Sequence, residues 1–289
     1  MSPRNGAVLG ATKIVDNGPS AGRWDLVIMG DGFTAAEIPQ FAAEVSRVTN
    51  IILATPPFDE LRPAINVHRV DVASTESGIG DLCSGVHRAT YFDANFCVDG
   101  IQRLLISDVS TVFDTAMSAV SQMNAPLVIA NSQTYGGGAS GGVPTFSLAP
   151  TAVEIALHEM GHAHFGLADE YPYLNDCKEA GHGQYSGQEP SEPNVTSRLN
   201  PLKWSAFATT TTIPTTKNRD CSDCDRQPNP SPPQTVGAYE GARYYRCGMF
   251  RPQFDCRMNQ LGVPYCAVCR ATIKRVLGPF MPHRRAAKK

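Results

Sequence analysis

One short segment of this chain, residues 157–171, constrains its fold and its chemistry more than any other feature. It contains the pattern His-Glu-x-x-His, in which His158 and His162 are four positions apart and Glu159 lies between them. On an α-helix, residues at this spacing lie about 40° apart on one face, so both imidazoles can point toward one ion. Two such imidazoles can bind zinc, and the neighbouring glutamate can act as a general base. The pattern therefore predicts a helix that carries a metal site.

Signals on both sides of the pattern place it on a helix with a defined start and end. Thr151 and Glu154 form a capping-box pattern, in which each side chain can satisfy a backbone N–H group at the helix start. Gly166 predicts the helix end, because glycine readily adopts the left-handed conformation that follows a helix C-terminus. A turn at this glycine would bring Asp169 back toward the histidines as an oxygen ligand, with Glu170 as its close competitor.

A third histidine follows the pattern and is not expected to join the site. His164 lies two positions after His162, which is about 200° around the same helix. A lone buried histidine is usually a core residue, whereas two histidines at helical spacing with an intervening glutamate are rarely explained by packing. We therefore expect the metal ligands to be His158, His162 and Asp169.

This segment and several other blocks resemble the IgA-peptidase family of bacterial zinc metallopeptidases, a metzincin-like group. The resemblance lies in His-Glu-x-Gly-His followed by Gly-Leu-Ala-Asp-Glu-Tyr, and in blocks that come in family order at 28–34, 57–58, 66–67, 74–78 and 135–137. It extends over residues 24–277 and implies a zinc endopeptidase with His158, His162 and Asp169 as ligands. In the same resemblance Glu159 is the general base. It does not imply that immunoglobulin is the substrate.

The spacing around the motif departs from that of most metzincins, in which a glycine follows the second histidine by three residues and the third ligand by six. Here Gly166 follows by four residues and Asp169 by seven, as in the resembled family. Metzincins also carry a methionine turn beneath the metal, and residues 256–259, with Met258, resemble it; Met249 is the alternative. A buried thioether there would form an apolar floor under the imidazoles.

The residue that stabilises the oxyanion is left open by the sequence. Many relatives of the broader group place a tyrosine just after the methionine, but Asn259 and Gln260 stand there in this chain. The remaining candidates for this role are Tyr244, Tyr245 and Tyr265.

The predicted ligand set implies a hydrolytic mechanism. Three protein ligands leave one position on zinc for water, whose pKa the metal lowers toward neutrality. Glu159 would take the proton of that water as it attacks a peptide carbonyl, and would pass the proton to the leaving amine. The alternatives are a non-catalytic zinc-containing binding module and a zinc hydrolase of a non-peptide bond. The intact Glu159 argues against the first, and a glycine-rich candidate edge strand for an extended peptide, at 135–142, argues against the second.

The pattern of the whole chain predicts an α/β (α+β), metzincin-like fold, with a mixed twisted sheet and an active-site helix over a loop-rich C-terminal subdomain. Apolar runs predict strands at 24–29, 64–72 and 126–130. Helical periodicity predicts helices at 34–52, 99–122 and 267–277. We expect one catalytic domain at 24–277, with an upper subdomain at 24–165 and a lower subdomain at 166–277. Outside this domain we expect an N-terminal extension at 1–23 and a basic tail at 278–289.

Composition gives no reason to expect partners other than the protein or peptide substrate that the resemblance implies. Hydrophobic residues make up 42% of the 289 residues, which is enough for a sizeable core. The net charge of −2 gives no reason to expect nucleic acid. No segment reaches the roughly 18 to 20 apolar residues that span a membrane. The oligomeric state is not indicated.

Nine cysteines favour an oxidising compartment, so we expect a secreted or otherwise extracytoplasmic protein, although residues 1–19 lack an apolar signal core. Cys83 and Cys97 form a plausible local disulfide. The odd count leaves at least one thiol unpaired if the others form bridges. Toward the C-terminus, disulfides are favoured over a second, structural zinc site, whose ligands would be Cys221, Cys224, Cys266 and Cys269.

Overall fold

The computed structural model describes residues 5–172, 183–222 and 228–282 of the chain. They fall into two compact units. The first unit is Met1–His164 with Arg275–Lys289, and the second unit is Phe165–Lys274. The division after His164 lies one residue before the boundary at 165/166 that the sequence predicts between the upper and lower subdomains. The first unit also contains residues that precede position 24.

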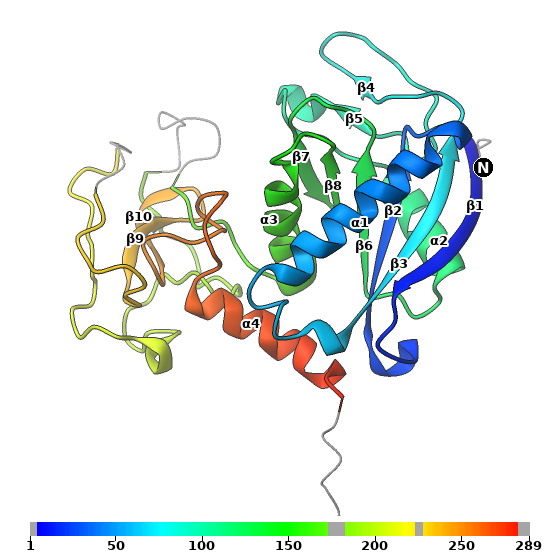
Figure 1. Cartoon of the computed structure of the whole chain (residues 1–289). Coiled ribbons are helices and arrows are strands. Elements are labelled where there is room, and N and C mark those ends of the chain that lie inside the picture. The colour runs from blue at the N-terminus through cyan, green and yellow to red at the C-terminus, as the bar shows by residue number, and fades with distance from the viewer. Residues whose placement is uncertain (1–4, 173–182, 223–227, 283–289) are drawn as a thin grey trace, which may run out of the picture. The chain divides into compact units, whose positions relative to one another are not determined.

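The first unit is built on a six-stranded mixed sheet in the order β1-β3-β2-β6-β8-β7 (Figure 1). Four neighbouring strands are parallel, and the two edge strands, β1 and β7, are antiparallel to their neighbours. The strands are β1 (Gly6–Val15), β2 (Trp24–Asp31), β3 (Ile65–Ser74), β6 (Ala125–Ala130), β7 (Gly137–Ser140) and β8 (Val143–Ser147). Every residue of β2 and β6 is buried, as expected for parallel strands covered on both faces. The three strands predicted from apolar runs are confirmed.

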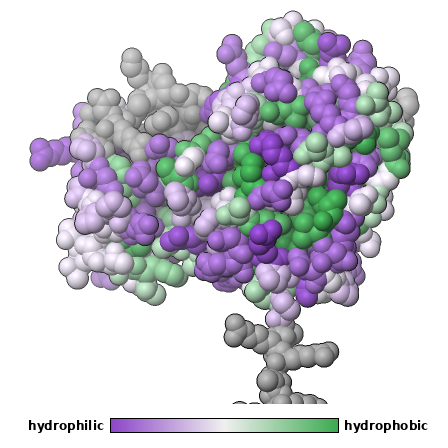
Figure 2. All heavy atoms as spheres, viewed as in Figure 1, coloured by the Kyte–Doolittle hydropathy of each residue, from purple (hydrophilic) through white to green (hydrophobic). Residues whose placement is uncertain are grey.

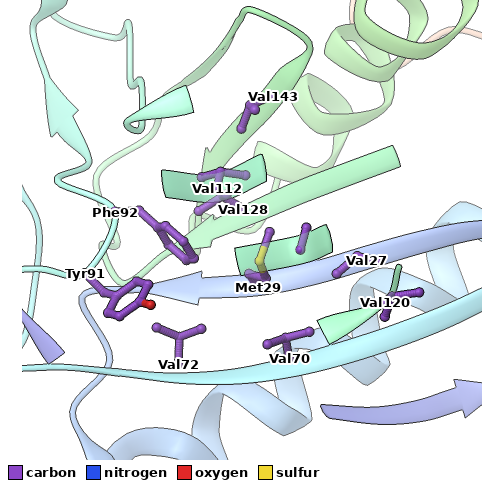
Figure 3. Close-up of a cluster of buried hydrophobic side chains, with 11 residues drawn as sticks. Val27, Met29, Val70, Val72, Tyr91, Phe92, Val112, Val120, Val128 and Val143 are labelled. Atoms are coloured by element: carbon purple, nitrogen blue, oxygen red, sulfur yellow. The ribbon is translucent and has the colours of Figure 1, made fainter. Parts of the chain in front are cut away.

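Helices α1 (Ile38–Ala54) and α2 (Val109–Ala119) lie on opposite faces of this sheet (Figure 1). Side chains of a strand alternate between the two faces. Val27 and Met29 of β2 belong to a buried cluster with residues of α2, in which valines of four strands meet (Figure 3). On the other face, Phe41 of α1 lies so close to Gly30 that a Cβ there would come within 2.8 Å of its ring. Each face of the sheet is thus covered by at least one amphipathic helix.

The start of α1 follows the sequence prediction. Thr34 and Glu37 form the expected capping box, and the Thr34 N–H donates to the Glu37 carboxylate at 2.8 Å. A short 3-10 turn, Ala35–Glu37, precedes the α-helix. The buried residues of α1 recur at the predicted spacing: Phe41, Val45, Val48, Thr49, Ile52 and Leu53.

The helix predicted at 99–122 is much shorter in the structure, because α2 begins only at Val109. Asp99 and Gly100 have φ angles of 54° and 74°, which end any helix that passes through them. Asp108 caps α2 instead, with its carboxylate accepting from the Thr111 N–H at 2.7 Å. Of the apolar residues before this cap, Leu105 is buried and Ile101 and Leu104 are half-buried in irregular chain, so their helical spacing was coincidental.

The sequence predicts residues 1–23 to be an extension outside the domain, yet β1 extends the sheet from within them. It pairs with β3 over most of its length. Most of its residues are exposed, including Leu9 at 55%, so the strand lacks the apolar run that would have identified it. Figure 2 shows hydrophobic residues interleaved with hydrophilic ones on the surface of this unit.

The predicted disulfide between Cys83 and Cys97 is present. It joins two parts of an irregular segment that contains the paired two-residue strands β4 (Gly80–Asp81) and β5 (Asn95–Phe96). No helix within the described residues is long and apolar enough to cross a membrane.

The second unit has little regular structure. Its strands β9 (Tyr239–Ala242) and β10 (Tyr245–Arg251) form an antiparallel hairpin, and α4 (Ala267–Leu277) begins near its end, as predicted. The sequence analysis did not predict the hairpin. Its turn uses Arg243 and Tyr244 with φ angles of 51° and 69°, where Asn-Gly or Asp-Gly would have been the usual signal.

Candidate metal centre

The His-Glu-x-x-His motif lies on α3 (Ala152–Phe165), as the sequence predicts. The helix is followed by Gly166 with a φ of 62°, which is the predicted left-handed stop. Leu157 and Met160 are fully buried and fix the inner face of the helix. Ile155 packs so close to Gly137 of β7 that a Cβ on this glycine would lie 2.9 Å from it. Packing against the sheet thereby sets which face of α3 is left for chemistry.

The two motif histidines point their Nε2 atoms at each other. These atoms are 3.0 Å apart, and the ring planes are 81° from parallel with centroids 4.7 Å apart. Zinc–nitrogen bonds of 2.0–2.1 Å in a tetrahedral site place two ligand nitrogens about 3.3 Å apart. Two facing nitrogens of neutral imidazoles repel unless a proton or a cation lies between them. The donor set and its spacing therefore fit a metal ion.

The other polar residues of α3 occupy different surroundings. Glu159, the predicted base, follows His158 directly and is half-buried. His164 contacts the ring of Trp24 on β2, with centroids 6.0 Å apart, so it faces the sheet as predicted. Burial lowers the pKa of His164 to about 4 and outweighs its hydrogen bonds to the Pro126 and Ala163 backbone. His164 is therefore neutral at physiological pH.

Asp169 belongs to the second unit, where the hairpin turn holds it. Its backbone carbonyl accepts from the Arg243 N–H at 2.9 Å, and its carboxylate accepts a hydrogen bond from the Tyr244 hydroxyl. The Tyr244 N–H in turn donates to the Tyr171 carbonyl at 2.9 Å. The carboxylate is thus buried and oriented by groups from a segment that is distant in sequence.

Glu170, the competitor of Asp169, has a different environment. It is fully buried, its N–H donates to the Met258 carbonyl at 2.7 Å, and its Oε1 accepts from the Asn194 amide at 2.9 Å. Its carboxylate lies among three cysteine thiols rather than beside Tyr244. Burial, followed by the charge of Cys256, raises the pKa of Glu170. Asp169 and Glu170 are adjacent in the sequence, yet their carboxylates contact different groups.

Both methionines considered for the turn are fully buried. Met258 lies in a tight turn in which the Asn259 and Gln260 N–H groups donate to the Cys256 carbonyl at 2.8 and 2.9 Å. Met249 belongs instead to a core cluster with Ala168, Val195 and Ala242. Met258 is therefore the methionine that lies in a turn.

The three candidate tyrosines differ in what they contact. Tyr265 is buried with the Arg257 guanidinium 5.3 Å from its ring centre. Tyr245 packs edge-on against Tyr185, with centroids 4.8 Å apart. Tyr244 donates a hydrogen bond from its hydroxyl to a predicted site residue, Asp169.

The glycine-rich stretch forms the edge strand β7, but its glycines have another use than the one predicted. Gly136, Gly137 and Gly138 are buried by the chain itself, and the Gly137 N–H donates to the Arg103 carbonyl at 3.0 Å. A Cβ at Gly138 would lie 2.5 Å from the side chain of Leu104. Close internal packing therefore explains the glycines, and the half-exposed residues of β7 are the two at its end, 139–140.

The disfavoured four-cysteine zinc site is wrong, because Cys221 forms a disulfide with Cys247. Cys224 lies outside the described residues. Cys256, Cys266 and Cys269 are buried and form no disulfide. The sequence did not predict that these three thiols would meet Glu170, because their positions span most of the second unit.

Comparison with known proteins identifies a family. The family model described as IgA Peptidase M64 matches residues 12–228 and 223–277, a range that contains the motif, the hairpin and α4. No curated protein matches the chain. The resemblance read from the sequence is thereby confirmed. The chain belongs to the IgA Peptidase M64 family and is a metallopeptidase, a hydrolase that acts on peptide bonds.

Proposed function

We propose that this peptidase is a zinc-dependent endopeptidase whose metal is held by His158, His162 and Asp169. The observation that carries the proposal is the convergence of two imidazole Nε2 atoms 3.0 Å apart on α3. Imidazole nitrogens favour zinc over hard cations such as magnesium or calcium. When bound, zinc supplies a Lewis acid that lowers the pKa of water and polarises a substrate carbonyl.

Glu159 is the proposed general base. Its carboxylate accepts the proton that water loses as the water oxygen bonds to the peptide carbonyl carbon. The same carboxyl group then donates this proton to the amide nitrogen as the carbon–nitrogen bond breaks. The half-buried position of Glu159, next to His158 on a rigid helix, suits a group that must both reach solvent and stay oriented.

Asp169 is the proposed third ligand in preference to Glu170. Carboxylates that bind metals are commonly oriented by a hydrogen bond from a neighbouring group, and Tyr244 makes such a bond to Asp169. Glu170 is committed to Asn194 and the Met258 backbone. Tyr244 is accordingly a positioning residue, and Met258 is the proposed apolar floor of the site.

The proposed substrates are proteins or peptides in extended conformation. An extended chain can add to an exposed sheet edge through backbone hydrogen bonds, and the half-exposed end of β7 offers such an edge. Two disulfides within the described residues support a place of action outside the reducing cytoplasm.

Glu159→Gln tests the proposal most directly. Loss of the base is expected to lower the rate of casein hydrolysis by about 10²–10⁴-fold, since this is the usual contribution of acid–base catalysis. Bound zinc, measured by elemental analysis, is expected to stay at the wild-type level. Glu154→Gln, five positions earlier on α3, is the matched control and should leave hydrolysis unchanged, because glutamine can also serve at this capping-box position. Wild-type cleavage by Glu159→Gln would overturn the assignment of the base.

A further inference from the structure

A second group of potential metal ligands lies within the second unit. It consists of Glu170, Cys256, Cys266 and Cys269, each of which contributes one ligand atom within 4.8 Å of the others. None of the four is more than 2% exposed. The Glu170 Oε2 atom is buried and has no hydrogen-bond partner. A buried carboxylate oxygen without a partner is costly unless a cation compensates for it.

We propose that these four side chains bind a structural zinc ion. Thiolates select zinc among the common divalent metals, and four protein ligands close the coordination shell of a tetrahedral site. Such a site has no open position for water and is therefore structural rather than catalytic. The proposal does not depend on the function assigned to the motif histidines.

The backbone around the sulfurs suits thiolates. The Cys266 N–H lies 3.2 Å from the Cys256 Sγ, and the Cys269 N–H lies 3.4 Å from the Cys266 Sγ. Both Cys266 and Cys269 stand at the beginning of α4, where the helix dipole favours negative charge. The Cys-x-x-Cys spacing at the start of a helix therefore supports Cys266 and Cys269 as ligands of the same ion.

A disulfide accounts for the cluster less well. The Cys256 and Cys269 sulfurs are 3.7 Å apart, whereas a disulfide bond is about 2.0 Å long. One bridge among three thiols would leave the third thiol beside a buried carboxylate, with no role for Glu170. A single divalent ion uses all four groups and offsets their charge.

Asn194 provides the outer support that metal-ligating carboxylates usually have. Its amide N–H₂ donates to Glu170 Oε1 at 2.9 Å and to the Ala168 carbonyl at 2.8 Å. Its Oδ1 accepts from the Ala168 N–H at 2.8 Å. A fully buried amide thus fixes both the backbone and the carboxylate of the 168–170 segment.

The ion would join three parts of the second unit that are distant in sequence: the segment after α3, the turn at Cys256 and the start of α4. Glu170 directly follows Asp169, so the ion would also fix the backbone that carries the proposed catalytic ligand. This last consequence rests on the proposed function. The bound ion would therefore hold in place the irregular segment of the second unit that contains Asp169.

Zinc stoichiometry tests the proposal in the full-length protein. After dialysis against a chelating resin, the wild type is expected to hold two zinc ions per chain and Cys269→Ser one. The double variant Cys83→Ser with Cys97→Ser removes two cysteines of the first unit and should keep both ions. A zinc count in Cys269→Ser equal to that of the wild type would overturn the proposal, whether the wild type holds one ion or two.

A second measurement covers the case in which Cys269→Ser does not fold. His158→Ala is expected to lose the motif ion and to keep the other. X-ray absorption of its remaining zinc should show about three sulfur neighbours, and cobalt substitution should give thiolate charge-transfer bands. Absence of sulfur neighbours would refute the cysteine site. Two ions retained in His158→Ala would instead refute the histidine site, so the two failures are distinguishable.

Discussion

The two units hold their functional residues by different means. In the first unit, His158 and His162 are spaced by one turn of a helix that packs on a regular sheet. In the second, Asp169 and Glu170 lie in irregular chain, where hydrogen bonds with the hairpin turn, the Asn194 amide and the Met258 carbonyl hold them. Repetitive backbone geometry orients the first pair, and long-range contacts orient the second. The first arrangement resists local change, whereas the second depends on each contact.

Among the variants that test this contrast between the units, Asp169→Asn is expected to have the largest effect. Asp169→Asn keeps the shape but loses the charge of the proposed ligand. It is expected to lower kcat/KM for peptide hydrolysis by more than about 100-fold, beyond the 10–100-fold usual for outer-shell partners. Asp255→Asn, at an exposed position of the same unit, should be near wild type. If Asp169→Asn retains full activity and full zinc, the third ligand must lie elsewhere.

Tyr244→Phe sharpens the contrast, because it removes only the hydroxyl that orients Asp169. The expected result is a 10–100-fold loss of zinc affinity, measured by competition with a fluorescent chelator. Tyr245→Phe is the matched control, since that ring packs on Tyr185 instead. A direct role of Tyr244 in stabilising the oxyanion would lower kcat and leave zinc affinity unchanged.

The sequence predicted the first unit better than the second for a physical reason. Strands β2 and β6 are apolar runs buried on both faces, and α1 and α3 carry periodic residues and caps that act within a few positions. The motif histidines are likewise related by helix geometry alone. These signals are local, so one sequence suffices to find them.

The errors arose where distant contacts decide the structure. β1 has few buried residues and is a strand because β3 offers it an edge. The helix predicted before Val109 is prevented by two residues with positive φ. The cluster around Glu170 joins residues nearly a hundred positions apart. No rule based on sequence spacing predicts that Glu170 contacts these cysteines, or that Glu170 and Asp169 have different partners.

Gly166 lies where the two kinds of arrangement meet along the chain. Its φ of 62° is costly for other residues, and a Cβ there would meet nothing within 4 Å. Gly166→Ala is therefore expected to destabilise the protein by roughly 1–2 kcal/mol through backbone strain alone. Urea unfolding measures this change. Gly278→Ala, at an equally open site without positive φ, should show no such loss.

The smallest effect is expected at the start of α1, where regular structure is supported by many contacts. Thr34→Ala removes one half of the capping box with Glu37 and should lower the free energy of unfolding by about 1 kcal/mol. Hydrolytic activity should stay unchanged, because neighbouring packing keeps α1 in place. Ser46→Ala, at an exposed mid-helix position, is the control and should be neutral or slightly stabilising. If Thr34→Ala lowered activity as strongly as Tyr244→Phe, the first unit would also depend on single contacts, and the contrast between the units would fail.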